Sequence, residues 1–174
     1  TELKEWKSEN NGIVAETVTQ ITGVGNSDGM KIKLDSTLRS RQRFENQKIV
    51  QQEILAERSQ VSSGANPPTV QVNLPEQVRP GEQFNFDVIV KEPLGDKLLL
   101  GTAVEEPIKP DTYTKPSNFE LDLLPAGGIF KVGKAPAAQQ NRWLSAVLIR
   151  SDGMIVITQR LQVGDRPSTS SSSK

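Results

Sequence analysis

One stretch, residues 30–44, constrains the fold of this chain more than any other. Apolar or neutral side chains occupy its even positions, and every charged side chain occupies an odd position. Strict alternation of this kind predicts a β-strand with one apolar face and one cationic face. At about 3.3 Å per residue the strand would reach roughly 50 Å, so it must be bent or coiled and paired along both edges. Its apolar members are Met30, Ile32, Leu34, Leu38 and Phe44, and its charged members are Lys31, Lys33, Asp35, Arg39, Arg41 and Arg43.

The segments on either side of this stretch extend the predicted sheet. Residues 2–9 alternate weakly, and residues 13–22 are rich in β-branched side chains, which favours two earlier strands. Residues 48–61 leave two interpretations open, because their propensity also suits a helix. We favour a strand that returns through a loop at residues 45–47, since this hairpin pairs apolar with apolar and cation with anion. It places Leu38 opposite Ile54, Gln42 opposite Val50, and Arg39 opposite Glu53.

The length and spacing of the predicted strands change after residues 64–68. This segment contains two prolines, so we read it as a linker at a domain boundary. Residues 69–164 then show about seven short strands separated by Gly- and Pro-containing turns, the pattern of an immunoglobulin-like antiparallel β-sandwich. Residues 165–174 form a Ser-rich tail that we expect to be disordered. The predicted organisation is therefore a curved antiparallel sheet over residues 1–63, a linker, a sandwich and a tail.

One strand of the predicted sandwich, residues 143–149, is apolar on both faces. We take Leu144, Ala146 and Leu148 as its outer face, which something must cover. The first domain, another subunit and a second sheet layer all remain candidates for that cover.

Composition excludes several classes of function. The 21 basic residues balance the 21 acidic ones, so no overall field favours nucleic acid, and we predict no nucleic-acid partner. With no cysteine and no histidine, the chain lacks disulfides, thiolate sites and the usual zinc ligands and general bases. We predict no catalytic residue, metal or cofactor. No apolar run approaches the ~20 residues that span a bilayer. The chain begins at Thr1 rather than Met, so a removed targeting segment, and with it a cell-envelope or extracytoplasmic location, stays open.

The candidate binding residues lie on the cationic face of the long strand and its neighbours. Arg39 and Arg41, with Glu16 and Glu53 from the adjacent strands, can surround a polar pocket on the curved sheet. The alternative is a solvated sheet face on which these charges pair with one another, and this is the commoner use of such residues.

The first 63 residues resemble a known family. The run at residues 13–19, the long strand at 34–44 and the segment at 48–54 are similar to the sheet half of a nuclear transport factor 2-like domain. The whole chain resembles uncharacterised cyanobacterial proteins of that superfamily in which an immunoglobulin-like module follows. The resemblance implies a cone-like α+β domain that here lacks its N-terminal helices, and it transfers no functional residue.

Three functional hypotheses follow. The first is a non-enzymatic binding or scaffold protein that acts through protein–protein or ligand contacts. Its partner would be another protein or a second copy of the same chain. The alternative is a small-ligand carrier, or a carboxylate-based lyase or isomerase, with its pocket on the concave sheet. A third hypothesis is a protein that binds an anionic polymer through the cationic face of the long strand.

Overall fold

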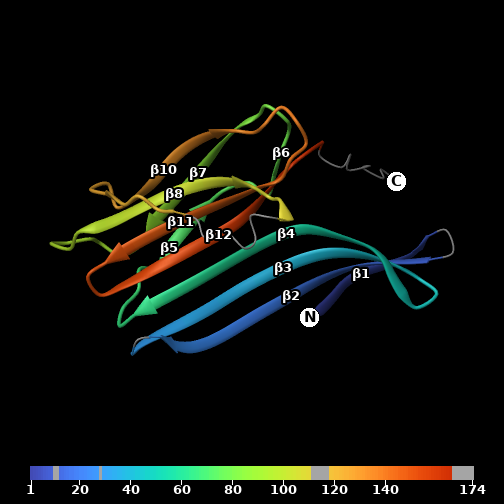
Figure 1. Ribbon diagram of the computed structural model, residues 1–174, viewed down its shortest axis with the longest axis horizontal. Coiled ribbons are helices and arrows are strands. Elements are labelled where there is room, and N and C mark those ends of the chain that lie inside the picture. Colours follow the sequence, from blue (N-terminus) through green and yellow to red (C-terminus); the bar gives the residue numbers. More distant parts are fainter. Residues whose placement is uncertain (10–11, 28, 111–117, 166–174) are drawn as a thin grey trace, which may run out of the picture.

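The computed structural model describes residues 1–9, 12–27, 29–110 and 118–165 (Figure 1). These residues form no α-helix, and their strands build one nine-stranded and one three-stranded sheet, so the predicted mainly-β fold class is confirmed. The larger sheet runs β1-β2-β3-β4-β12-β11-β8-β9, with β6 also paired to β12, and the smaller runs β10-β7-β5. The strands are β1 (Glu2–Glu9), β2 (Gly12–Ser27), β3 (Met30–Glu45), β4 (Lys48–Gly64), β5 (Val70–Asn73), β6 (Gln77–Val78), β7 (Gln83–Val90), β8 (Leu99–Pro107), β9 (Asp122–Leu123), β10 (Gly128–Lys134), β11 (Arg142–Arg150) and β12 (Gly153–Val163).

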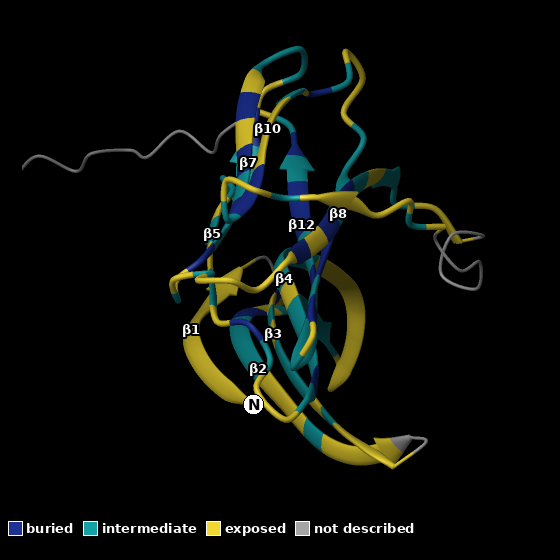
Figure 2. Ribbon diagram, turned by 90° about the vertical axis from the view of Figure 1, so that its left-hand side faces the viewer, coloured by how far each residue is buried: buried dark blue, intermediate teal, exposed yellow. Residues whose placement is uncertain are grey.

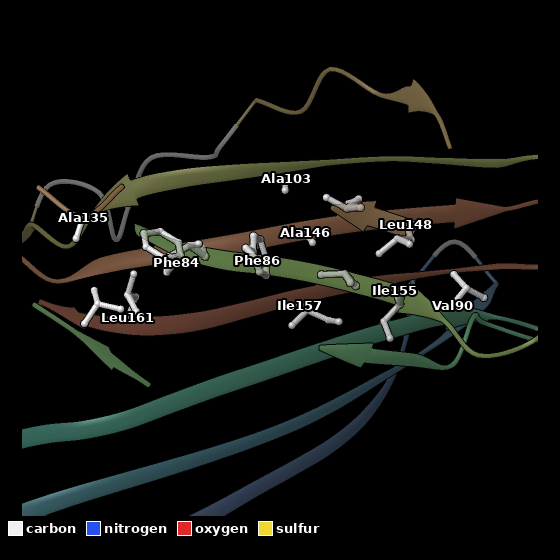
Figure 3. Close-up of a cluster of buried hydrophobic side chains, with 14 of the residues drawn as sticks. Phe84, Phe86, Val90, Ala103, Ala135, Ala146, Leu148, Ile155, Ile157 and Leu161 are labelled. Atoms are coloured by element: carbon white, nitrogen blue, oxygen red, sulfur yellow. The ribbon is translucent and has the colours of Figure 1, made fainter. Parts of the chain in front are cut away.

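The hydrophobic core lies between the small sheet and the β8–β11–β12 part of the large one (Figure 3). Alternation in β7 sends Phe84 and Phe86 inward, where they meet side chains from all three opposing strands. Leu144, Ala146 and Leu148 of β11 belong to this core. The cover of these three residues is therefore the small sheet, so the second sheet layer is the candidate that is confirmed, and the face that they form is an inner one.

Strands β1–β4, which we call the ribbon, form an antiparallel meander that continues the sandwich sheet. The long strand is confirmed as β3, and the strand interpretation of residues 48–61 is confirmed by β4. β4 pairs with β12 from Arg58 to Gly64, so the two predicted domains share one sheet. Figure 2 shows how exposed β1 is compared with the buried residues of β7 and β12.

The β3–β4 hairpin differs from the predicted one in loop length and register. Its loop is Asn46-Gln47, both residues having positive φ (48° and 63°), and Glu45 pairs with Lys48. Two register shifts then leave one extra residue each on β4, because a bulge sets two residues opposite one. The predicted pairs are wrong: Leu38 lies opposite Glu57, Gln42 opposite Gln52, and Arg39 opposite Ala56.

The two faces of the ribbon continue the two faces of the sandwich sheet. Cross-strand partners share a face, and core residue Ile157 pairs with Gln60, which pairs with Asp35. The charged face of β3 therefore lies on the core side of the sheet. The apolar face lies on the outer side.

The predicted linker, residues 64–68, is fixed to the turn between β11 and β12. The Asn66 amide donates to the Asp152 carbonyl at 2.8 Å, and Arg150 donates to the Asn66 carbonyl at 3.0 Å. Gly64, at φ 105°, has no room for a side chain, because a Cβ there would lie 2.5 Å from the Gly153 Cα. Of the predicted tail, all but Asp165 lies outside the described residues. Within the described ranges no helix has the length and apolar character to cross a membrane.

Candidate functional site

The four sequence-predicted site residues lie together on the charged face of the ribbon. Glu16 of β2 pairs with Arg41 of β3, which pairs with Glu53 of β4, so the three stand in one row across three strands. Arg39 is two residues along β3 and therefore shares their face. All four line one hollow of about 330 Å³.

This hollow lies at a fork in the large sheet. β4 pairs with β12 only as far as Arg58 and Gln159, and beyond that point β6 takes the place beside β12 through the parallel pair Gln77–Gln162. The extra residue Leu55 bulges from β4 just before the fork, where a bulge increases the local bend. The diverging ribbon thus opens a space between itself and β6.

Three side-chain contacts hold the fork together. Arg160 donates to Glu57 Oε2 from Nε at 3.2 Å and from Nη2 at 2.9 Å. Gln162 donates to the Ile54 carbonyl at 2.7 Å. Arg39 Nη2 lies 2.7 Å from Glu76 Oε2, so the partner of Arg39 is a residue next to β6 and not Glu53.

Both arginines of the hollow are already paired with carboxylates. Arg41 donates to Glu16 Oε1 from Nε at 2.9 Å and from Nη2 at 2.6 Å, and its Nη1 lies 3.6 Å from Glu53 Oε2. The hydrogen bond to Glu16, together with the charges of Glu16 and Glu53, raises the pKa of Arg41 above its ordinary value, against the opposing effect of desolvation. Because Oε1 of Glu16 already accepts two hydrogen bonds from Arg41, this carboxylate is poorly placed to act as a base.

Two further cations of β3 are also paired. Lys33 Nζ lies 2.8 Å from Asp35, and Arg43 Nε lies 2.8 Å from Glu45 Oε1. The long strand therefore does not present a row of free positive charges to an anionic polymer. Among the described residues, no group of three or more His, Cys, Asp or Glu side chains is arranged to hold a metal ion.

A second hollow, of about 410 Å³, adjoins the first and shares Arg39 and Glu76 with it. It is lined by Val18 of β2 as well as Val72 of β5. Val18 lies three strands away from β12 in the large sheet, and Val72 lies in the small sheet. Because both residues line one hollow, the ribbon must curve toward β5 on its charged face. Sequence analysis did not single out Glu76 or Arg160, because the contacts of both depend on where the ribbon bends.

Residues 65–164, more than half of the chain, match the family described as Domain of unknown function (DUF8623). The chain belongs to this family. The DUF8623 match begins directly after β4 and covers β5 to β12, so it contains the sandwich and leaves out the ribbon. No curated protein matches the chain significantly.

Outside the DUF8623 match, the ribbon carries exposed apolar side chains on one face. Trp6 is 61% exposed, Met30 54% and Ile21 48%. These residues share the outer face of the ribbon with Leu3, Ile13 and Ile49, which are also exposed. We call this set of six the apolar face. The alternation in residues 30–44 signals such a face, but it does not reveal that the described chain leaves it uncovered.

Proposed function

We propose that the protein is a non-enzymatic binding module that holds a partner protein against the apolar face of its ribbon. The observation that carries this proposal is the exposure of Leu3, Trp6, Ile13, Ile21, Met30 and Ile49 on one side of a single sheet. Exposed apolar side chains that share one face of a sheet are a feature of interaction sites. Trp and Met are also enriched in the cores of protein interfaces.

We also propose that the sandwich is immunoglobulin-like and that the ribbon is a partial nuclear transport factor 2-like sheet. The strand order β5-β7-β10 facing β8-β11-β12 supports an immunoglobulin-like sandwich, because it matches the A-B-E and C-F-G sheets of that fold. The curved ribbon supports a partial nuclear transport factor 2-like sheet. An amphipathic helix of the partner is the occupant that we expect on the apolar face, because the apolar stripe of such a helix can cover exposed side chains spaced along one face of a sheet.

The test uses neighbouring residues that face opposite sides of β2. A photo-crosslinking benzoylphenylalanine replaces either Ile21, on the apolar face, or Gln20, on the charged face, in cells that make the protein. We expect a discrete protein adduct from position 21 only. The purified adduct partner should then bind the wild-type protein at least about tenfold more tightly than Ile21→Asp. Equal adducts from both positions, or none, would contradict the proposal.

A second candidate rests on the convergence of Glu16, Arg39, Arg41 and Glu53 in the 330 Å³ hollow. The hollow has the size of a small-ligand site, which suits a carrier or a carboxylate-based lyase or isomerase. The mutual ion pairing of its charges favours the binding module instead. A metabolite that raises the melting temperature of the wild type or is turned over by it, and loses this effect in Glu53→Gln, would establish the second candidate.

A further inference from the structure

In the part of the chain that the structure describes, no strand joins the two sheets on the side of the sandwich farthest from the ribbon. There β10 ends the small sheet, and β8 pairs with β9 only at Leu100 and Gly101. Beyond Gly101, β8 has only β11 as a partner among the described strands. The two sheets are therefore bridged on this side by side chains and not by a backbone ladder.

A small apolar hollow lies in this opening. It has a volume of about 170 Å³, and its walls include the core residues Phe84, Phe86, Ala103 and Leu144. This volume is more than five times the ~30 Å³ share of one water molecule, yet it is below the ~300 Å³ of the smallest drug-sized sites. The hollow therefore suits one branched apolar side chain and not a whole small molecule.

The backbone of β10 offers hydrogen-bonding groups beside the hollow. The Val90 amide donates to the Gly127 carbonyl at 3.0 Å, so Gly127 and alternate residues after it direct their backbone groups toward β7. Phe130 and Val132 consequently direct theirs toward the open edge. Their side chains are 56% and 72% exposed. An exposed apolar strand edge of this kind is a template for another strand.

Lys131 adds a charge to the rim of the hollow. Its Nζ donates to the Ala103 carbonyl at 2.7 Å, across the gap between β10 and β8. Glu105, also on the rim, lies 3.2 Å from Arg142 and is neutralised by it. The rim is therefore positive at Lys131, which favours a carboxylate on whatever lies next to it.

We infer that this opening binds an extended peptide segment that adds a strand to β10, places one leucine-sized side chain in the hollow and sets a carboxylate beside Lys131. Strand addition uses main-chain hydrogen bonds for affinity and a side-chain pocket for specificity, and the opening supplies both. The site lies at the opposite end of the large sheet from the ribbon. A test of peptide binding at this site is consequently independent of the proposal that the apolar face binds a partner.

The probe is the acetylated peptide Thr-Val-Thr-Leu-Thr-Val-Glu, added to the isotope-labelled full chain. We expect a Kd of about 10–100 µM. Amide chemical-shift changes should be concentrated in residues 102–105 and 130–134. A peptide with serine in place of its leucine should bind about tenfold more weakly, and so should one with N-methylated backbone amides on its edge-facing side.

Two variants at one position separate strand addition from other binding. Val132→Pro removes an amide that points to the open edge and makes no bond to β7, so the fold should persist while peptide affinity falls about tenfold. Val132→Thr keeps the amide and should bind within about twofold of the wild type. If Val132→Pro fails to fold, the N-methylated peptide on the wild type makes the same test.

Three results would overturn the inference. The first is an absence of shifts at roughly 1 mM peptide. The second is shifts confined to the ribbon, which would assign the peptide to the apolar face. The third is a concentration-dependent dimer that Val132→Pro dissolves, which would make a second copy the occupant of the β10 edge.

Discussion

Asp152, in the turn between β11 and β12, joins more parts of the chain than any other single residue described above. Its carboxylate accepts hydrogen bonds from Lys97, from Arg150 at 2.7 Å and from Asn66 at 3.3 Å. The Arg150 side chain is almost completely buried, so it depends on Asp152 for charge compensation. The hydrogen bonds from Lys97 and then Arg150 hold the pKa of Asp152 well below its ordinary value.

We expect Asp152→Asn to lower the melting temperature at pH 7 by roughly 3–6 °C. The pKa of Asp152 is depressed in the folded state, so its stabilising effect is fully present above about pH 5, the upper side of an unfolded carboxyl titration. That effect fades as pH falls below about 4 toward the folded pKa, because the unfolded chain takes up a proton on Asp152 that the folded chain does not.

Melting curves of the wild type and Asp152→Asn between pH 7 and pH 3 make the measurement. The difference between their melting temperatures should narrow as the solution becomes acidic. A difference that stays constant down to pH 3 would show that the Asp152 charge does not stabilise the fold. Asp96→Asn, at an exposed position before β8, is the matched control and should follow the wild type throughout.

At the scale of elements, the β3–β4 hairpin shows what local sequence does and does not specify. Both loop residues have positive φ, as a two-residue hairpin turn with the right twist requires. Asn46 suits this conformation, but Gln47 does not, because a β-carbon costs about 1 kcal/mol in the left-handed region. The hairpin therefore carries strain at one residue.

Replacing Gln47 with glycine should relieve that strain. We expect Gln47→Gly to stabilise the hairpin by about 1 kcal/mol, which corresponds to roughly fivefold slower hydrogen exchange of the Glu45 and Lys48 amides. Gln52→Gly is the control, since Gln52 lies inside β4 without a positive φ and should lose stability instead. Faster exchange at Glu45 and Lys48 in Gln47→Gly would contradict this account.

The same hairpin explains which parts of the fold and site were predictable. Alternation identified β3, β4 and the sandwich strands, because a period of two follows directly from burial of one face. The register was missed because the loop is one residue shorter than predicted, and because the bulges at Val50 and Leu55, which have no residue signature, each shift every later pair. That the four predicted residues lie together was predictable because they follow the strand faces. Glu76 was missed because its contact with Arg39 spans 37 residues and depends on the bend at the fork.

At the scale of the whole molecule, the core and the ribbon are stabilised in different ways. The core cluster draws every buried member from residues between Val78 and Val163. In the ribbon, the buried hydrophobic residues are Val14 and Ala15 alone among those described. The ribbon is therefore held by its hydrogen-bonded ladder, by the β4–β12 pairing and by the contacts at the fork, and sheets without a packed apolar face are weakly stable by themselves.

This difference predicts that residues 65–165 fold alone and residues 1–64 do not. The shorter chain keeps the whole core cluster, but it loses the seven β4–β12 pairs from Arg58 to Gly64, so we expect a cooperative transition with a melting temperature roughly 5–10 °C below that of the full chain. Hydrogen exchange of the full chain should show protection that falls from β12 through β4 to β1. A fragment of residues 65–165 without a cooperative transition, or uniform protection across the ribbon, would mean that the ribbon is part of the folding unit and not an extension built on its edge.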